Sequence, residues 1–490
     1  MHARLSSLAR PDLLKNAAFV GGEWLQREDS FVVSDPATDT QVARVANASE
    51  ADASAAIAAA QAALPAWRDL PARERSAILR RWYELIIANR DDLATLMTAE
   101  QGKPLAEARG EVGYGAAFVE WFAEEARRIE GELIATPQRD RRLLVLRQPV
   151  GVCAAITPWN FPIAMLTRKA APALAAGCTV IAKPAEQTPL CALALAVLAQ
   201  EAGMPAGVLN VLPADAERSL AIGKVLCDSP VVRHLSFTGS TEVGRILMAQ
   251  CAPTLKRLSL ELGGHAPFIV FDDADIDAAV EGAIVSKYRN AGQTCVCANR
   301  FLVHAKVHDR FVDRLVQRVA GMKVGNGFDD GVELGPLIDD AGVAKVERHL
   351  ADALQHGARC VTGGQRIGGR LFSPAVLTGV TPEMLVSREE TFGPVAPVMK
   401  FHDDAEAIRL ANASEFGLAA YFYSRDMARV WRVAEALEYG MVGINTGFIS
   451  HEVAPFGGIK QSGFGREGSR HGIEEYLDMK YLCLAGLDAG

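Results

Sequence analysis

The 490-residue sequence lacks an apolar run long enough to cross a membrane. The longest candidate, residues 170–182, contains Pro172 and Gly177 and is shorter than the roughly 20 residues that a membrane-spanning helix needs. The first ten residues also lack the apolar segment of a secretory signal. We therefore expect a cytoplasmic protein that has no membrane partner.

An excess of basic residues is also absent, because 51 Lys and Arg stand against 59 Asp and Glu, a formal net charge of −8. No broad cationic surface is expected, and we therefore expect no nucleic-acid partner. The nine cysteines are odd in number and widely scattered, which argues against a disulfide framework. The pair Cys295 and Cys297 alone is a poor zinc signature, and we expect no metal site.

A chain of this length is expected to fold as two or three packed units. From residue 149 onward, short apolar strands alternate with helices, and a second alternating series runs from residue 266 to about residue 453. Such alternation predicts doubly wound parallel sheets, in which nucleotides bind at the carboxyl ends of strands. The predicted fold class is α/β, with two doubly wound domains.

Some segments fall outside this alternation. Residues 141–147 and 476–483 are typical of strands, and we expect them to pair as a small β extension that builds an oligomer. Nearer the N-terminus, Ser49 is a suitable N-cap for an Ala-rich helix, which we expect to end at Pro65.

Three short segments carry residue types suited to catalysis. Residues 157–162 (Thr-Pro-Trp-Asn-Phe-Pro) follow a strand, and their two prolines would hold the Asn160 amide rigidly, as an oxyanion hole requires. Taken alone, this segment is more simply a rigid strand-to-helix turn. The sequence Glu-Leu-Gly-Gly at 261–264 ends a strand, where Glu261 is either a general base or an ion-paired structural acid.

The third segment is Gly-Gln-Thr-Cys at 292–295, which follows a helical stretch. A thiolate is a strong nucleophile at neutral pH if its pKa is lowered or it is partly exposed, although a lone cysteine is usually structural. Residues 236–244 follow a strand and open a helix, which suits a pyrophosphate, but they lack the full G-x-G-x-x-G pattern. Lys183 and Glu186 follow another strand end and could bind ribose hydroxyls.

Together these segments resemble the aldehyde dehydrogenase superfamily, and the resemblance covers nearly the whole chain. Each match is modest alone, but seven in the same order are hard to obtain by chance. The seven are Pro-Trp-Asn at 158–160, Lys-Pro-Ala-Glu at 183–186, Phe-Thr-Gly-Ser at 237–240, Glu-Leu-Gly-Gly at 261–264, Gly-Gln-Thr-Cys at 292–295, Glu-Glu-Thr-Phe-Gly-Pro at 389–394 and Pro-Phe-Gly-Gly at 455–458.

The resemblance implies a domain plan and a set of roles. Residues 1–130 and 149–259 would form an NAD(P)-binding Rossmann-like domain, residues 260–455 a catalytic domain, and residues 131–148 and 470–490 a β-strand oligomerisation segment of a homodimer or homotetramer. The residues implied to bind the dinucleotide are Trp159, Lys183, Glu186, Gly239, Ser240, Leu262, Glu390 and Phe392.

By the same resemblance, Cys295 is the nucleophile and Glu261 the general base. Asn160 and the backbone N–H of Cys295 would form the oxyanion site. The thiolate would add to an aldehyde, the thiohemiacetal would give up hydride to NAD(P), and Glu261 would activate the water that hydrolyses the thioester.

Within the superfamily the chain is most similar to succinate-semialdehyde dehydrogenases, which implies that Arg168, Arg289 and Ser450 hold a substrate carboxylate. Taken alone, either arginine is more simply a structural ion pair, but Arg289 lies six positions before Cys295, which favours a substrate role for it. Glutarate semialdehyde, one methylene longer, and a broader range of aldehydes stay open as alternatives. Glu186 beside the adenosine ribose would favour NAD, while Lys183 leaves NADP possible as a second cofactor.

Cys297 is a candidate for a reversible disulfide that blocks Cys295, as in some members of that subfamily, and a buried structural thiol is the equal alternative. His265 stands where relatives commonly place Lys or Asn, and we expect a structural role for it. The presence of Asn160, Glu261 and Cys295 argues against a non-catalytic relative. Glu261 also argues against a CoA-acylating enzyme, and the cofactor segments argue against a simple thiol hydrolase.

Overall fold

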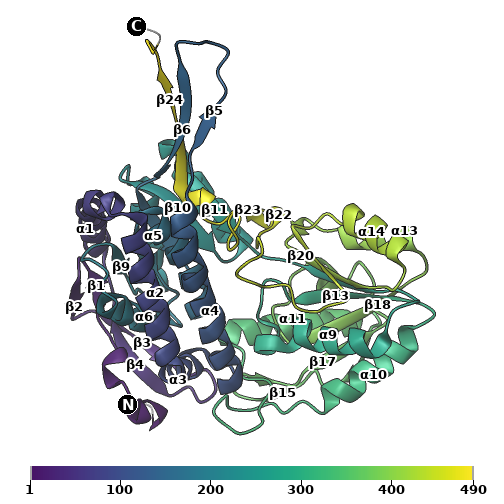
Figure 1. Ribbon diagram of the computed structural model, residues 1–490. Helices are drawn as coiled ribbons and strands as arrows, with labels where there is room; N and C mark the ends of the chain where they lie inside the picture. The colour runs from purple at the N-terminus through teal and green to yellow at the C-terminus, as the bar shows by residue number, and fades with distance from the viewer. Residues whose placement is uncertain (1–2, 488–490) are drawn as a thin grey trace.

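A mostly parallel sheet organises the N-terminal half of the chain (Figure 1). The computed structural model describes residues 3–487, so the ends of the ranges predicted above, 1–2 and 488–490, lie outside the described residues. The strand order is β2-β1-β9-β8-β7-β10-β11-β23, with β7 to β11 mutually parallel. The strands are β1 (Ala18–Val20), β2 (Glu23–Leu25), β7 (Val152–Ile156), β8 (Thr179–Lys183), β9 (Leu209–Val211), β10 (Val232–Thr238), β11 (Arg257–Glu261) and β23 (Gly463–Phe464).

Helices cover both faces of this sheet, because its central strands are apolar on both sides. In β7, Cys153 and Ala155 enter one core, while Val152 and Ala154 enter the other. The helices α2 to α6 contribute to the first core, and α1, α7 and α8 contribute to the second. Their bounds are α1 (Glu50–Asp69), α2 (Ala72–Ala88), α3 (Arg90–Gln101), α4 (Leu105–Glu125), α5 (Pro162–Ala176), α6 (Pro189–Glu201), α7 (Ala216–Asp228) and α8 (Thr241–Cys251).

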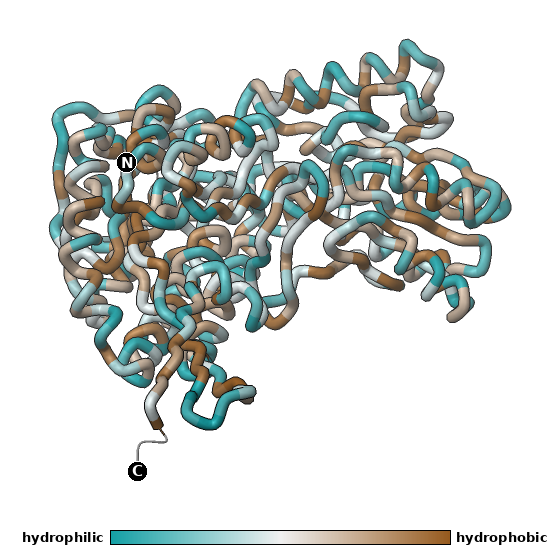
Figure 2. Tube along the Cα trace, turned by 90° about the horizontal axis from the view of Figure 1, so that it is seen from above, coloured by the Kyte–Doolittle hydropathy of each residue, from teal (hydrophilic) through white to brown (hydrophobic). Residues whose placement is uncertain are grey.

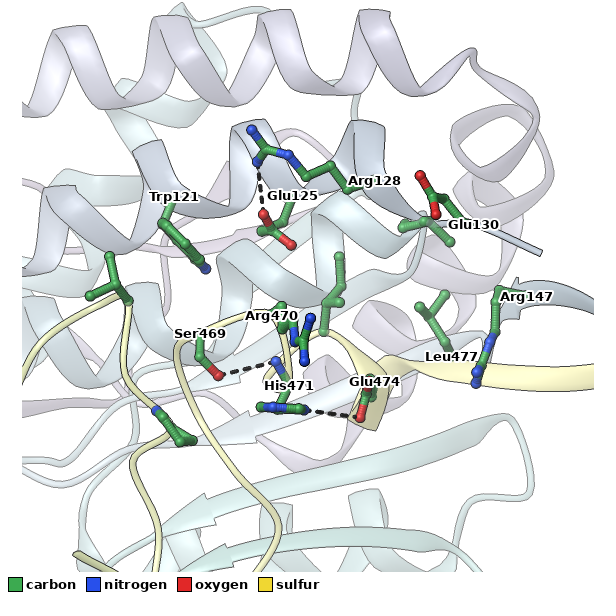
Figure 3. Close-up of a pocket in the computed structure, with 14 residues that line it drawn as sticks. Trp121, Glu125, Arg128, Glu130, Arg147, Ser469, Arg470, His471, Glu474 and Leu477 are labelled. Atoms are coloured by element: carbon green, nitrogen blue, oxygen red, sulfur yellow. Dashed lines mark hydrogen bonds and ion pairs between the residues drawn. The ribbon is translucent and has the colours of Figure 1, made fainter. Parts of the chain in front are cut away.

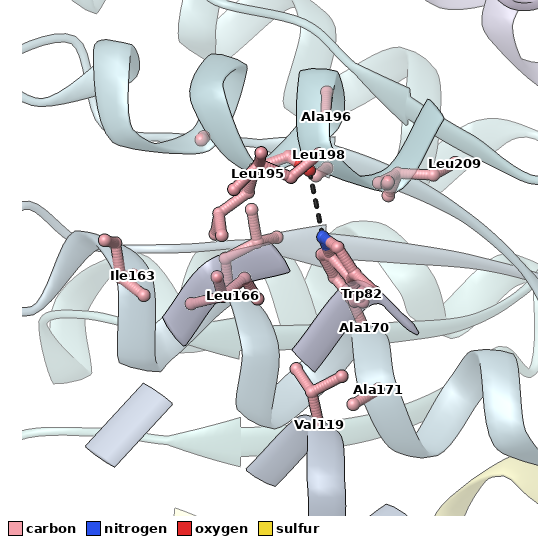
Figure 4. Packing of buried hydrophobic residues seen from close by; sticks show 14 of the residues in the cluster. Trp82, Val119, Ile163, Leu166, Ala170, Ala171, Leu195, Ala196, Leu198 and Leu209 are labelled. Carbon is pink, nitrogen blue, oxygen red and sulfur yellow. Dashed lines mark hydrogen bonds between the residues drawn. The ribbon is translucent and has the colours of Figure 1, made fainter. Parts of the chain in front are cut away.

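Two buried tryptophans tie α1 and α2 to the neighbouring helices α5 and α6. The Trp82 indole donates to the Leu195 carbonyl at 3.0 Å and packs among side chains from α4 to α6 (Figure 4). The Trp67 indole donates to the Leu174 carbonyl at 3.2 Å. Because this bond anchors the last turn of α1, the helix continues through Pro65 to Asp69, and the predicted end at Pro65 is wrong.

A second sheet forms the other α/β domain, with strand order β14-β17-β18-β13-β12-β20-β21, parallel except at β14. The strands are β12 (Ala266–Val270), β13 (Ala298–His304), β14 (Arg359–Thr362), β17 (Ala375–Thr378), β18 (Val395–Phe401), β20 (Ala419–Tyr423) and β21 (Met441–Ile444). Its helices are α9 (Ile276–Tyr288), α10 (His308–Ala320), α11 (Asp340–Gln355), α12 (Leu385–Arg388), α13 (Asp404–Asn412) and α14 (Met427–Ala436). Two α/β domains are therefore confirmed, whereas their exact boundaries stay a prediction.

A β arm projects from the first domain (Figure 1). Its antiparallel strands are β5 (Glu132–Ile134), β6 (Arg142–Pro149) and β24 (Leu477–Leu484), so the two isolated strands predicted from the sequence do pair with each other. Hydrophobic residues lie along the arm beside the C-terminus (Figure 2).

The remaining elements are short. The strand pairs are β3 (Ser30–Ser34) with β4 (Gln41–Ala46), β15 (Arg366–Gly368) with β16 (Leu371–Phe372), and β19 (Phe416–Gly417) with β22 (Ile459–Lys460). The 3-10 helices are η1 (Ala3–Ser7), η2 (Pro11–Leu13), η3 (Ala126–Arg128), η4 (Ala252–Thr254), η5 (Arg289–Gly292) and η6 (Glu474–Tyr476). Between residues 3 and 487, no helix has the length and apolar character to span a bilayer. The same residues contain no cluster of three or more His, Cys, Asp or Glu side chains arranged to hold a metal ion.

Candidate active site

The predicted catalytic residues lie where secondary-structure elements end. Asn160 lies in the turn between β7 and α5, Glu261 is the last residue of β11, and Cys295 follows α9 and η5. Because β7 and β11 flank β10 in parallel, Asn160 and Glu261 come to the same edge of the sheet. The second domain contributes Cys295 from across the gap between the two sheets.

A sharp reversal directs the segment that carries the candidate nucleophile. Asn290, Ala291 and Gly292 all have left-handed backbone, with φ of 52°, 54° and 77°. A Cβ at Gly292 would lie 2.3 Å from the carbonyl oxygen of Gly393, so this close approach requires glycine. The Asn290 amide donates to the Asn160 carbonyl at 3.1 Å and thereby ties the reversal to the turn after β7.

A cavity of about 500 Å³ brings many of the predicted residues together. It contains both Asn160 and Cys295, which lie far apart in the sequence. Its lining also includes residues that the sequence analysis missed, notably Lys345 on α11 and Asp339, the N-cap of that helix. The predicted cofactor residues in the lining are Trp159, Gly239, Ser240, Leu262, Glu390 and Phe392.

Buried polar contacts hold the Asn160 turn rigid. The side-chain amide of Asn160 donates to the Gln293 carbonyl at 3.0 Å, while its Oδ1 has no hydrogen-bond partner among residues 3–487. Lys103 donates to the Asn160 carbonyl at 2.8 Å and forms a fully buried ion pair with Glu111. Glu111 also accepts from the Ile163 backbone N–H at the start of α5, at 3.0 Å. The amide is therefore preorganised beside the segment that bears the thiol.

Burial dominates the electrostatics of Cys295. It raises the pKa of the Cys295 thiol to about 12, and the positive charge of Arg168 opposes this rise. The neighbouring carboxyls of Glu390 and Glu261 add to it, whereas Arg289 lowers it. The thiol is therefore protonated at neutral pH, and its activation depends on the cations around it.

Glu261 is buried, and neither carboxylate oxygen has a hydrogen-bond partner among the described residues. Burial raises the pKa of Glu261 well above that of an ordinary glutamate, and the charge of Glu467 raises it further. Arg168 and Lys169 oppose this rise, but both already pair with Glu467. This shift favours the protonated form of Glu261, which must lose its proton before it can act as a base.

The turn from β10 into α8 borders the same cavity. Ser240 caps α8 by accepting from the Val243 backbone N–H at 3.2 Å, and Gly239 donates to the Glu261 carbonyl at 3.1 Å. A Cβ at Gly239 would lie 2.4 Å from the ring of Phe237. This turn presents free backbone N–H groups at a helix N-terminus, as a pyrophosphate requires.

Some of the other predicted cofactor residues line the cavity and others do not. Trp159 meets Phe392 edge to face, with ring centroids 5.6 Å apart. Burial raises the pKa of Glu390 to about 7, and this carboxyl accepts from the Gly264 backbone N–H at 3.3 Å. Lys183 and Glu186 follow β8 and do not line the cavity. Their charged atoms are 4.0 Å apart, and burial lowers the pKa of Lys183 to about 8.

The three predicted carboxylate-binding residues separate into two environments. Arg289 and Ser450 line a second, smaller cavity together with Thr294 and Val296, the neighbours of the candidate nucleophile. The Arg289 guanidinium lies between two aromatic rings, and no carboxylate among the described residues pairs with it. Arg168, in contrast, is buried against Phe456 and forms an ion pair with Glu467.

Cys297 and His265 are both packed in the interior. The Lys287 ammonium donates to the Cys297 thiol at 3.3 Å, so a disulfide to Cys295 would have to break this contact; the redox role of Cys297 stays a prediction. His265 is buried beside Arg300, and burial lowers its pKa well below that of an ordinary histidine, so it is neutral.

Another cavity, of about 570 Å³, lies elsewhere, at the base of the arm. Figure 3 shows Trp121 and Glu125 on one side of it and Arg470 and His471 on the other. None of the predicted site residues lines it.

Comparisons with known proteins agree with this arrangement. The sequence model described as "Aldehyde dehydrogenase family" matches residues 24–482. A glutarate-semialdehyde dehydrogenase from Pseudomonas putida is 59% identical over 475 residues, which is 96% of this chain and 98% of the relative. A succinate-semialdehyde dehydrogenase [NADP(+)] from Escherichia coli is also 59% identical, over 96% of this chain and 98% of the relative. The crystal structure of succinate-semialdehyde dehydrogenase from Burkholderia pseudomallei has a TM-score of 0.96 and 60% identity, over 98% of this chain and 100% of that chain.

The raised pKa of Cys295 predicts its chemical reactivity. Because a thiol with a pKa near 12 is almost entirely protonated at pH 7, alkylation by iodoacetamide is expected to accelerate about tenfold per pH unit between pH 7 and 10. Mass spectrometry of the Cys295 peptide measures the rate in the ligand-free protein, with the exposed Cys483 as an internal control for reagent access. A Cys295 rate that is already constant from pH 7 upward contradicts the expected pKa.

Proposed function

The chain belongs to the aldehyde dehydrogenase family, and on this premise we propose that it oxidises succinate semialdehyde to succinate. It is an NAD(P)-dependent oxidoreductase. The observation that carries the choice of substrate is the Arg289 guanidinium, which lacks a carboxylate partner among the described residues and lies beside Ser450 in a cavity next to the Cys295 segment. A cation so placed suits an aldehyde whose far end carries a carboxylate.

In the proposed reaction, the Cys295 thiolate adds to the aldehyde carbon. The Asn160 amide and the backbone N–H of Cys295 stabilise the negative oxygen of the adduct. The hydrogen bonds that hold the Asn160 turn rigid support this role. A bound NAD(P) would supply the hydride acceptor, so that the thiohemiacetal on Cys295 would be oxidised to a thioester. Glu261, once it has lost its proton, removes a proton from the water that releases the acid.

The residues around the cavity that contains Asn160 and Cys295 fit a dinucleotide. The cavity is open at the N-terminus of α8, where a side chain at Gly239 would be crowded and backbone N–H groups are available for phosphate. Glu390 offers a buried carboxyl suited to ribose hydroxyls. The residues that would hold the cofactor are Trp159, Lys183, Glu186, Gly239, Ser240, Leu262, Glu390 and Phe392.

A second candidate substrate is glutarate semialdehyde, which the name of the Pseudomonas putida relative favours. One additional methylene changes the free energy of binding by only about 1–3 kcal/mol. Both compounds therefore suit the same carboxylate clamp, which consists of Arg168, Arg289 and Ser450. Arg168 would contribute less to that clamp than Arg289, because Glu467 already neutralises it.

The clamp predicts a charge-specific effect of Arg289→Met. The value of kcat/KM for succinate semialdehyde is expected to fall by about a hundredfold, because the substrate carboxylate loses its cation. For butanal, which has the same length and no charge, kcat/KM is expected to change less than threefold. Steady-state absorbance of the reduced nicotinamide measures both.

The matched control is Arg310→Met, which removes an exposed arginine on α10. Cys295→Ala sets the baseline, since it is expected to abolish oxidation of both aldehydes. A wild-type enzyme that prefers butanal to succinate semialdehyde would falsify the proposed substrate.

We also propose that NAD is preferred to NADP. Glu186, half-buried after β8, would accept a hydrogen bond from a ribose 2′-hydroxyl and would repel a 2′-phosphate. Glu186→Gln is therefore expected to raise the ratio of kcat/KM for NADP to that for NAD by roughly tenfold or more. Glu217→Gln, at an exposed position on α7, is the control. A wild-type preference for NADP, as in the name of the Escherichia coli relative, would contradict this proposal.

The arm supports a proposal of self-association into a homodimer or homotetramer. Leu133, Met479 and Tyr481 are between 59% and 72% exposed on its strands, and such apolar patches commonly mark protein interfaces. Because the outer edge of β24 is unpaired in the described sheet, a second copy of the chain is a suitable partner.

This assembly predicts the effect of charge on the arm. The double variant Leu133→Asp/Met479→Asp is expected to contain fewer subunits than the wild type, because burying two carboxylates in an apolar interface is costly. Light scattering after size-exclusion chromatography measures the mass. Leu220→Asp, at a position that is 71% exposed on α7, is the control. An unchanged mass in the arm variant would refute the proposal.

A further inference from the structure

Helix α11 contacts the chain on both sides of Phe392. On one side, the His349 imidazole lies 3.1 Å from the Thr391 hydroxyl. On the other side, a Cβ at Gly393 would overlap the side chain of Val346. Because residues three apart lie on the same face of a helix, one face of α11 packs along this segment. Both neighbours of Phe392 are therefore held by a single helix.

The backbone at Phe392 adopts a conformation that bulky residues rarely take. Its φ of 54° lies in the left-handed region, where a side chain is strained. Such a conformation persists only when surrounding contacts maintain it, and it is common at ligand sites. Phe392 lines the cavity together with Glu390 and Thr391, and its ring meets Trp159 edge to face. The contacts that maintain this backbone therefore shape the wall of the cavity.

The His349 imidazole is fully buried and uses both of its ring nitrogens. Nε2 lies 3.1 Å from Glu389 Oε2, while Nδ1 faces the Thr391 hydroxyl. Since a carboxylate only accepts, Nε2 carries the proton and Nδ1 accepts from Thr391. Burial lowers the pKa of His349, so the ring is neutral and this pattern is complete. Arg348 also donates to the Glu389 carboxylate at 3.1 Å and orients it.

The residue before Thr391 lies at the Cys295 end of the cavity. Glu390 accepts from the Gly264 backbone N–H at 3.3 Å, and a Cβ at Gly264 would overlap the carbonyl oxygen of Cys295. Because the proposed reaction takes hydride from an adduct on Cys295, the nicotinamide half of the dinucleotide would bind at this end. The buried Thr391 hydroxyl thus connects this end of the cavity to His349.

We propose that His349 is a positioning residue for the dinucleotide. By holding Thr391, it keeps Glu390 and Phe392 in the arrangement that receives the nicotinamide half of NAD(P). This inference rests on the proposed function, because it needs Glu390 and Phe392 to contact the cofactor. His349 does not itself line the cavity, so its effect on the dinucleotide passes through Thr391.

The test compares the binding of NADH with that of AMP, which lacks the nicotinamide half, by isothermal titration calorimetry. His349→Ala removes the imidazole, and Thr391→Val removes the hydroxyl and keeps the shape. In either variant the dissociation constant of NADH is expected to rise about tenfold, because only the fraction of molecules with the segment in place binds the nicotinamide half. The dissociation constant of AMP is expected to stay within twofold of the wild type.

Two further variants separate positioning from a general loss of packing. His349→Gln offers an amide donor to Glu389 and a carbonyl acceptor to Thr391, so it is expected to restore NADH binding to within about threefold of the wild type. The double variant His349→Ala/Thr391→Val is expected to bind NADH as the weaker single variant does, because both changes remove the same contact.

His356→Ala, which removes an exposed histidine from the C-cap of α11, is the matched control and is expected to leave both dissociation constants unchanged. Thermal unfolding midpoints report whether each variant is folded, and Thr391→Val gives the same readout if His349→Ala does not fold. Wild-type affinity for NADH in the folded variants, or equal losses for NADH and AMP, would overturn the role of His349. A wild type that binds neither compound would instead overturn the proposed cofactor site.

Discussion

Desolvation is the constraint on which the candidate site depends. The same burial that shields the site raises the pKa values of Cys295, Glu261 and Glu390, so each acidic group in it tends to hold its proton. Fixed cations oppose this tendency, but the two that mainly oppose it at Glu261, Arg168 and Lys169, both pair with Glu467. A change in the charge of one group therefore alters the protonation of the others.

Buried polar contacts hold the Asn160 turn and the Cys295 segment in place. Lys103, in the segment between α3 and α4, and Glu111, on α4, connect this part of the chain to the start of α5 and to the turn that carries Asn160. The left-handed reversal at Asn290 brings the segment of the second domain against that turn. A catalytic geometry shared by two domains is thus fixed by contacts that cross between them.

The Cys295 segment also separates two cavities. Cys295 itself lines the larger cavity, whereas its neighbours Thr294 and Val296 line the smaller one that contains Arg289 and Ser450. In the proposed reaction, the aldehyde carbon would meet the sulfur at this boundary, with the cofactor on one side and the tail of the substrate on the other. This division explains why the residues suited to the cofactor and those suited to the carboxylate come from different elements.

Local signals in the sequence predicted the alternation of strands and helices. Short motifs at the ends of strands and of a helix indicated Asn160, Glu261 and Cys295 as candidates, because glycine, proline and turn residues constrain the backbone wherever they occur. Local reasoning was wrong at Pro65, where the Trp67 hydrogen bond anchors the helix beyond the proline. It gave no signal for Lys345, which is an ordinary helix residue until α11 packs beside the cavity. The sequence by itself therefore determined the element types and the reactive groups. Only the tertiary structure decided that Arg168 pairs with Glu467 while Arg289 has no ion-pair partner among the described residues, and that burial raises the pKa values of Cys295 and Glu261. Burial and ion pairing depend on residues that are distant in the chain.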